Sequence, residues 1–168
     1  MTLACSTMTS PVGMLTLVAG DAGLVAVLWE DDDPDRVRLG VMRADTDHPV
    51  LVETARQLGA YFAGERRSFD LPLDFRGTDF QKQVWAGLLA IPFGETRSYG
   101  DIARAIGRPS AVRAVGAANG RNPISIVAPC HRVIGTSGAL TGFAGGLDAK
   151  RFLLRLEGVA VEKMSSGE

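Results

Sequence analysis

The sequence of 168 residues contains only two cysteines and two histidines. Cys5, Cys130, His48 and His131 show none of the paired spacings that are typical of structural zinc sites, so no metal site is expected. Two cysteines in such a chain are expected to be reduced thiols. The sequence therefore favours an ordinary packed core over a fold held together by disulfides or zinc.

Long apolar runs are also absent. No segment approaches the roughly 20 apolar residues that are needed to cross a bilayer. The first residues lack a basic stretch followed by an apolar run, so we expect no signal peptide and a cytoplasmic protein. Hydrophobic residues make up 46% and charged residues 22% of the chain, which is typical of a folded protein of one compact or two small domains.

The net charge of -1 conceals an uneven distribution. Residues 1–75 carry 6 basic and 12 acidic side chains, which gives -6, whereas residues 76–135 carry 8 basic and 3 acidic, which gives +5. The basic side chains of this middle segment are Arg76, Lys82, Arg97, Arg104, Arg108, Arg113, Arg121 and Arg132. The excess indicates either a polyanionic partner or a solvated face, and charge alone does not separate the two.

The first 75 residues read as a small module of strands and one helix. Two β-branched-rich runs around a glycine-containing turn predict a β-hairpin from Met14 to Trp29. Apolar residues at helical spacing predict a helix from Pro49 to Ala63, with Asp47 as N-cap and Gly64 as stop. The segment from Ser68 to Phe75 contains proline and is predicted to be an edge strand.

Helices dominate the remainder. One is predicted to begin at Thr78 or Asp79. The stretch 98–107 opens with Ser98 and Asp101, the pattern of a capping box, and the stretch 108–120 has Ser110 as its expected N-cap. Two short helices around a glycine-containing turn predict a helix-turn-helix. A last helix is expected over 148–158, capped by Asp148.

The second helix of that pair carries almost no large side chains. Ala111, Ala114 and Gly116 leave it nearly bare, with Arg113 as the one long side chain in its middle. Small residues permit close helix packing, but a thin helix can also enter a groove of DNA while an arginine reaches inward. Both interpretations remain open on this pattern alone.

The stretch NPISIVAPCHRVIG places a thiol beside an imidazole. Ile124 to Ala128 is expected to be a buried, extended run that ends just before Cys130. A thiol is a weak nucleophile until it loses its proton, so a reactive cysteine needs a base. His131 could serve through a bridging water, and Glu157 could orient the imidazole as in catalytic triads. A buried structural cysteine is the commoner alternative.

Several motifs together resemble one known family. The stretches PCHRVIG, GTDFQKQVWAGLLAIPFGETRSYGDIA, RAVGAANGRNP, TGFAGG and LLRLEG are similar, in order and spacing, to those of the O6-alkylguanine-DNA alkyltransferases. SPVGMLTL resembles the N-terminal hairpin of that family. The resemblance covers nearly the whole chain and is strongest from Gly77 to Gly158.

The resemblance implies an α+β fold in two domains. Residues 1–75 would form a ribonuclease H-like domain of a small antiparallel sheet plus a helix, and residues 76–168 a mainly helical domain with the helix-turn-helix. The implied activity is direct repair: after base flipping, the O6-alkyl group of guanine in duplex DNA passes irreversibly to a cysteine. Some members also accept O4-alkylthymine. No cofactor is implied, and the protein would act as a monomer in the DNA minor groove, with cooperation on DNA left open.

The resemblance also assigns roles to individual residues. Cys130 corresponds to the acceptor thiol, His131 to the water-bridged base and Glu157 to the carboxylate that orients it. Asn122 would brace the active-site turn, and Tyr99 would contact the flipped base and its phosphate and donate a proton to guanine N3. Arg113 would fill the gap in the base stack. The DNA-facing helix would present Ala111, Ala114 and Gly116, and the substrate pocket would include Val133, Phe143, Ala144 and Gly145.

Two departures and two alternatives accompany this assignment. Phe143 stands where many members have tyrosine and Ala144 where some have serine, so the range of accepted alkyl groups is in doubt. A non-catalytic protein that binds alkylated DNA is one alternative, although such relatives lack the cysteine. A thiol hydrolase is another, but the sequence shows no oxyanion hole.

Overall fold

A computed structural model describes residues 2–135, 138, 140 and 142–161 of the chain. The chain forms two compact units, of which the first comprises Met1–Arg76 together with Pro123–Val127 and the second Gly77–Asn122 together with Ala128–Glu168. Within the described ranges, every helix is too short or too polar to cross a membrane.

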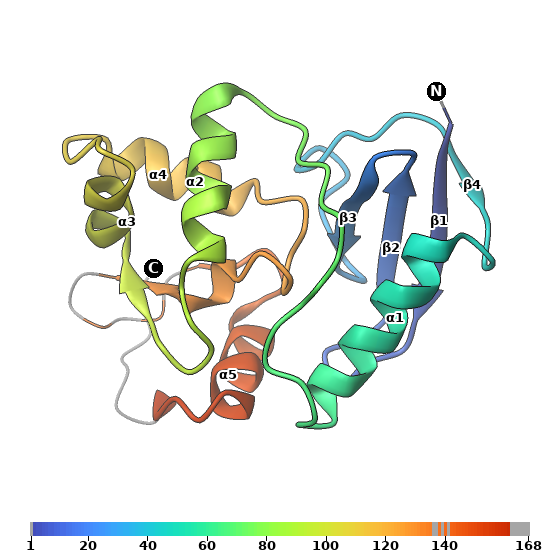
Figure 1. Ribbon diagram of the computed structural model, residues 1–168. Helices are drawn as coiled ribbons and strands as arrows, with labels where there is room; N and C mark the ends of the chain where they lie inside the picture. The colour runs from blue at the N-terminus through green and yellow to red at the C-terminus, as the bar shows by residue number, and fades with distance from the viewer. Residues whose placement is uncertain (1, 136–137, 139, 141, 162–168) are drawn as a thin grey trace. The chain divides into compact units, whose positions relative to one another are not determined.

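The first unit is built on a four-stranded sheet with the order β3-β2-β1-β4 (Figure 1). Its strands are β1 (Leu3–Met8), β2 (Leu15–Gly20), β3 (Gly23–Leu28) and β4 (Met42–Ala44). The predicted hairpin is confirmed as the antiparallel pair of β2 and β3. Strand β1 extends this antiparallel sheet, and the short β4, which the sequence did not predict, adds a parallel edge.

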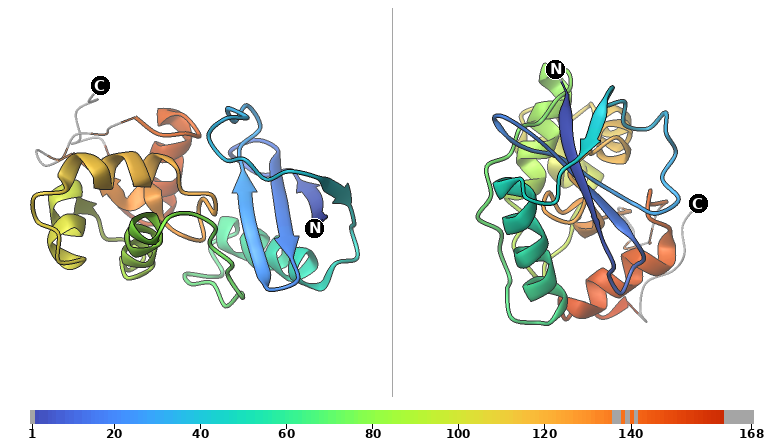
Figure 2. Two further views of the ribbon diagram at one scale, coloured as in Figure 1. Left: turned by 90° about the horizontal axis from the view of Figure 1, so that it is seen from above. Right: turned by 90° about the vertical axis from the view of Figure 1, so that its right-hand side faces the viewer.

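Helix α1 (Pro49–Phe62) packs against one face of the sheet, as both views in Figure 2 show. The predicted N-cap, Asp47, is wrong: the cap is His48, whose Nδ1 accepts a hydrogen bond from the backbone N–H two residues later at 3.2 Å. Proline at the first helical position holds the preceding residue in extended backbone, which is the conformation of a cap. The helix is followed by Gly64 at φ 77°, as expected.

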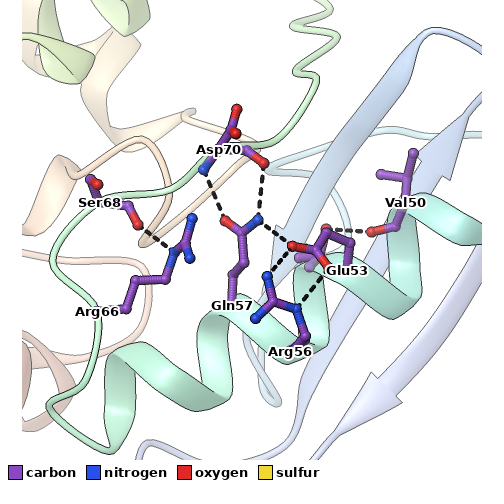
Figure 3. A network of polar contacts seen from close by, with 8 residues as sticks. Val50, Glu53, Arg56, Gln57, Arg66, Ser68 and Asp70 are labelled. Carbon is purple, nitrogen blue, oxygen red and sulfur yellow. Dashed lines mark hydrogen bonds and ion pairs between the residues drawn. The ribbon is translucent and has the colours of Figure 1, made fainter.

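Side chains of α1 hold the chain that follows it, as Figure 3 shows. The Gln57 amide accepts a hydrogen bond from the Asp70 N–H and donates one to the Asp70 carbonyl, both at 2.9 Å. Further along, Leu73 forms a parallel bridge to Leu24 at the edge of β3. The predicted edge strand over 68–75 is therefore confirmed as an extended segment with a single bridge.

A second segment covers the same edge of β3. The Val27 N–H donates to the Pro123 carbonyl at 2.9 Å, and Val27 forms a parallel bridge to Ile124. The extended run expected from Ile124 to Ala128 is wrong beyond Ser125, because the chain turns tightly at Ile126, which has φ 72°. This turn is buried, so an apolar sequence alone could not distinguish it from a strand.

The second unit contains four α-helices in the described residues, and three of them pack together (Figure 1). Helix α2 (Asp79–Leu89) contacts both α3 (Tyr99–Ala105) and α4 (Val112–Gly120), and these two also contact each other, as expected for a helix-turn-helix. The Trp85 indole N–H of α2 donates to the Ala118 carbonyl of α4 at 2.8 Å. Helix α5 (Leu147–Leu156) follows later in the chain, after the short 3-10 turn Cys130–Arg132.

Two of the four predicted caps in this unit are present. Thr78 and Ser98 each accept a hydrogen bond from the third backbone N–H of their helix and complete a capping box. Ser110 does not cap α4, which begins without a side-chain cap. Asp148 is the second residue of α5, not its cap, because α5 follows Gly146 at φ 89°. There its carboxylate still faces the positive end of the helix dipole.

Candidate active site

The candidate site is centred on a short 3-10 turn, Cys130–Arg132, in the second unit. Cys130 is 5% exposed, and its N–H donates to the Ala128 carbonyl at 2.8 Å. The buried Asn122 donates from Nδ2 to the same carbonyl at 2.8 Å. Asn122 therefore ties together the two ends of the excursion over residues 123–127, and it fixes the backbone immediately before the cysteine.

The next residue, His131, is completely buried and bound to a carboxylate. Its Nε2 lies 2.8 Å from Oε2 of Glu157, the residue that ends α5. An ionised carboxylate only accepts, so Nε2 carries the proton and Nδ1 is left as an acceptor. Nδ1 has no partner among the described protein atoms. Burial lowers the pKa of His131, while the bond to Glu157 acts in the opposite direction.

Glu157 is shared between two buried side chains. Arg132 donates to it from Nε at 2.7 Å and from Nη2 at 3.0 Å, and its Nη1 donates to the Ile91 carbonyl at 2.6 Å. Its guanidinium also lies 5.8 Å from the centre of the Phe93 ring. The sequence placed Arg132 among the basic residues that could form a polyanion-binding face. That placement is wrong, because Arg132 is 6% exposed and neutralises Glu157.

Strand pairing brings Tyr99 toward the cysteine turn. The two residues before it, β5 (Arg97–Ser98), pair in parallel with β6 (Val133–Ile134), which directly follows the turn. Tyr99 then opens α3 and is half-buried. A side chain added at Gly116 of α4 would meet the Tyr99 ring at 3.8 Å, so the two residues face each other. Glycine here leaves the tyrosine ring room against α4.

The expected pocket residues are joined through a lysine that the sequence did not single out. Lys150 of α5 is completely buried, and its Nζ donates to the Val133 carbonyl at 2.7 Å. The same ammonium lies 5.7 Å from the centre of the half-buried Phe143 ring. Gly145 is half-buried, whereas Ala144 is exposed. Val133 and Phe143 are thus brought together around one ammonium.

The remaining predicted residues lie on the outer face of α4. Arg113 and Ala114 are exposed and Ala111 is half-exposed, while Val115, Ala118 and Asn119 face inward. Among the described residues, Arg113 forms no ion pair. Arg113 therefore projects from an exposed helix face of small residues, whereas His131, Arg132 and Glu157 are buried.

Besides Arg155 of α5, five exposed basic residues of the second unit lie on α2, α3 and α4 or in the chain directly beside these helices. They are Lys82, Arg104, Arg108, Arg113 and Arg121. Arg104 is paired with Asp101, and Arg108 lies over the Phe80 ring at 5.9 Å. In the described part of the chain, no cluster of three metal-binding side chains is present.

The positions of Lys150 and Glu157 on the final helix carry a sequence signal for burial, although only Glu157 was predicted to belong to the site. Both fall on the apolar face of the final helix, at helical spacing with Leu153 and Leu154. A charged residue on such a face is rarely buried without a partner. Arg132 gave no comparable signal, because an arginine after a histidine in a basic segment is equally typical of a surface.

Comparison with known proteins matches both parts of the chain to one family. Residues 3–75 match the ribonuclease-like domain of 6-O-methylguanine DNA methyltransferase, and residues 79–159 match its DNA binding domain. A methylated-DNA–protein-cysteine methyltransferase of Methanosarcina acetivorans is 65% identical over 150 residues, which are 89% of this chain and 94% of the relative. One of Mycolicibacterium paratuberculosis is 54% identical over 152 residues, 90% of each chain.

A solved structure agrees with the architecture. The crystal structure of Mycobacterium tuberculosis OGT in complex with DNA superposes with a TM-score of 0.82 at 51% identity, and the match covers 94% of this chain and 92% of that one. The likeness extends through both units, so it includes the candidate site and the helix-turn-helix.

Proposed function

Because the chain belongs to the family of methylated-DNA–protein-cysteine methyltransferases, we propose that Cys130 is the residue that accepts the alkyl group. The protein repairs DNA by transferring an alkyl group to a cysteine, and it is an enzyme of this class. The observation that carries the assignment of Cys130 is its place beside the buried pair of His131 and Glu157. Because the alkyl group stays on sulfur, each molecule reacts once.

The buried pair supplies the base that a thiol requires. Glu157 holds the proton on Nε2 of His131, so Nδ1 can take the Cys130 proton through a bridging water. The thiolate then attacks the alkyl carbon: the S–C bond forms, the O6–C bond breaks, and its electron pair passes to guanine. The proton that left the thiol ends on guanine. Arg132 keeps Glu157 ionised throughout, so the carboxylate orients the imidazole and does not take its proton.

The pocket around the thiol is assigned to the extruded base. Tyr99 would donate its hydroxyl proton to guanine N3, which makes the base a better leaving group, and would recover it afterwards. The pairing of β5 with β6 supports this role, because it sets the first residue of α3 next to the strand that follows the cysteine. Val133 and Phe143 would form the walls, with Ala144 and Gly145 beside them. O4-alkylthymine is a second lesion that this pocket would accept.

Damaged duplex DNA is the partner, and α4 is the element that we assign to the minor groove. Its outer face of small residues fits a narrow groove, and the unpaired, exposed Arg113 fits the role of the side chain that replaces the flipped nucleotide. The five exposed basic residues would contact phosphates without reading sequence. These contacts need no second protein molecule, so we assign a monomer.

The chemistry also favours a reducing compartment. Cys5 and Cys130 are both free thiols in the structure, and an acceptor cysteine must remain reduced until it meets damage. We therefore place the activity in the cytoplasm.

The test is the stoichiometry of transfer. The protein is incubated with excess duplex that contains labelled O6-methylguanine, and the label per protein is counted by mass spectrometry. We expect one methyl group on Cys130, and none after Cys130→Ala, although that variant still binds DNA. Cys5→Ala is the matched control and keeps full transfer. Many turnovers per molecule would indicate a hydrolase, and labelling of any other residue would refute the assignment.

A further inference from the structure

The mechanism above leaves one buried charged group unused. Lys150 has no exposed surface; its ammonium donates to the Val133 carbonyl and lies over the face of the Phe143 ring. Among the described residues, no carboxylate is paired with it. An ammonium taken out of water without a counter-charge is costly to bury, so its position calls for an anion nearby.

The other charges around the turn already have partners. Arg132 and His131 from the 3-10 turn both bind Glu157 from α5, and the bidentate bond between Arg132 and Glu157 neutralises that carboxylate. Tyr99, which approaches from β5 and α3, carries a phenol hydroxyl and not a carboxylate. Asp148, in the first turn of α5, is exposed and lies beside Arg151. The remaining group that can become an anion is the thiol of Cys130.

The backbone connects the lysine to that thiol. Cys130 opens the 3-10 turn, and the N–H of Val133 donates back to the Cys130 carbonyl and closes it. The Val133 carbonyl accepts a hydrogen bond from the Lys150 ammonium. Burial lowers the pKa of Lys150 to about 8, and a negative charge on Cys130 opposes that shift. At neutral pH the group therefore remains largely a cation that faces the catalytic turn.

We propose that Lys150 is a positioning residue that stabilises the Cys130 thiolate before it attacks the alkylated base. This rests on the proposed role of Cys130 as acceptor. His131 removes the proton, and Lys150 stabilises the negative charge that remains on sulfur. The charge disappears when the S–C bond forms, so the lysine acts only up to that step. Through Val133 and Phe143 the same side chain also orders the pocket wall, and the test must separate the two effects.

The experiment measures the ionisation of the thiol itself, without DNA. In a Cys5→Ala background, the ultraviolet absorbance of the thiolate is followed against pH for the parent, for Lys150→Met and for Lys150→Arg. Arg155→Met is the matched control, because it removes an exposed cation from the same helix, α5. The pH profile of the reaction with the free base O6-benzylguanine is recorded for each protein.

We expect Lys150→Met to raise the pKa of the Cys130 thiol by about 1 to 2 units, which lowers the ratio of thiolate to thiol at a given pH by roughly ten- to a hundredfold. The reaction rate should fall with it and recover as the pH is raised. Lys150→Arg should keep the thiol pKa close to that of the parent protein, and Arg155→Met should change neither the thiol pKa nor the rate.

An unchanged thiol pKa in folded Lys150→Met would overturn the proposal even if the rate fell, since a disordered pocket wall slows transfer at every pH. If Lys150→Met does not fold, the parent protein decides: a Cys130 thiol that titrates at or above the value of free cysteine, about 8.5, would also overturn it. Failure of the acceptor assignment is seen separately, as the absence of an adduct on Cys130 after exposure to damaged duplex.

Discussion

At the scale of single residues, the most demanding interaction is the buried ion pair of Arg132 and Glu157. Removing one partner of a buried pair leaves an uncompensated charge, which costs about 3–5 kcal/mol. We therefore expect Arg132→Met to lower the free energy of unfolding by about that amount in urea titrations. Arg38→Met is the control, because the pair of Arg38 with Asp35 is 80% and 79% exposed and should contribute less than about 1 kcal/mol. Equal losses in both variants would contradict the buried network.

The residue scale also shows what the sequence could provide. The neighbouring cysteine and histidine indicated thiol chemistry with Glu157 as the orienting carboxylate, and the family resemblance supplied Asn122. The lysine and the arginine that surround them were not predicted, because Lys150 and Arg132 act only once α5 folds against the 3-10 turn. The place of Lys150 on an apolar helix face indicates burial, but hydrogen-bond partners that lie 17 or 25 positions away in the chain have no local pattern.

At the scale of elements, the short helix α3 depends on its cap. The Ser98 hydroxyl accepts from the Asp101 N–H, and the Asp101 carboxylate accepts from the Ser98 N–H, which holds the pKa of that carboxyl below its usual value. We expect Ser98→Ala to destabilise the protein by about 1 kcal/mol, measured by urea unfolding, and to slow repair because Tyr99 is the next residue. Ser110→Ala is the matched control: the sequence predicts a cap there as well, but α4 has none. A loss of stability at Ser110 as large as that at Ser98 would contradict these helix starts.

Elements with a local signal were predicted well, and those that depend on distant partners were not. The hairpin of β2 and β3 follows from its own turn, and the caps of α2 and α3 follow from three-residue spacings. In contrast, β4 is three exposed residues that become a strand only through pairing with β1. The turn at Ile126 follows the bridge of Ile124 to the edge of β3 and lies four residues before Cys130. It depends on these distant partners and not on a local pattern.

At the scale of the whole molecule, the chain is not divided at a single point. Residues 1–76 form most of the first unit, yet Pro123–Val127, between Asn122 and the cysteine turn, belongs to it as well. Composition and charge predicted a boundary between two units near residue 75. The return of the five residues Pro123–Val127 to the first unit has no compositional signal. Whether residues 1–75 and 76–168 behave as separate folding domains stays a prediction, and the position of this return bears on it directly.

The return segment predicts what happens when the chain is cut after Arg76. A fragment of residues 77–168 would contain Ile124, Ile126 and Val127, which are at most 6% exposed in the full chain, but it would lack the edge of β3 to which Ile124 is bridged. The backbone before Cys130 would then lose its support. We expect the fragment to unfold more easily and to transfer alkyl groups more slowly than the full chain, and the separately purified fragment 1–76 to restore the rate when added. The full chain cleaved after Arg76 and kept associated is the control. A lone fragment 77–168 that reacts at the rate of the full chain would show that the return segment has no part in holding the acceptor cysteine.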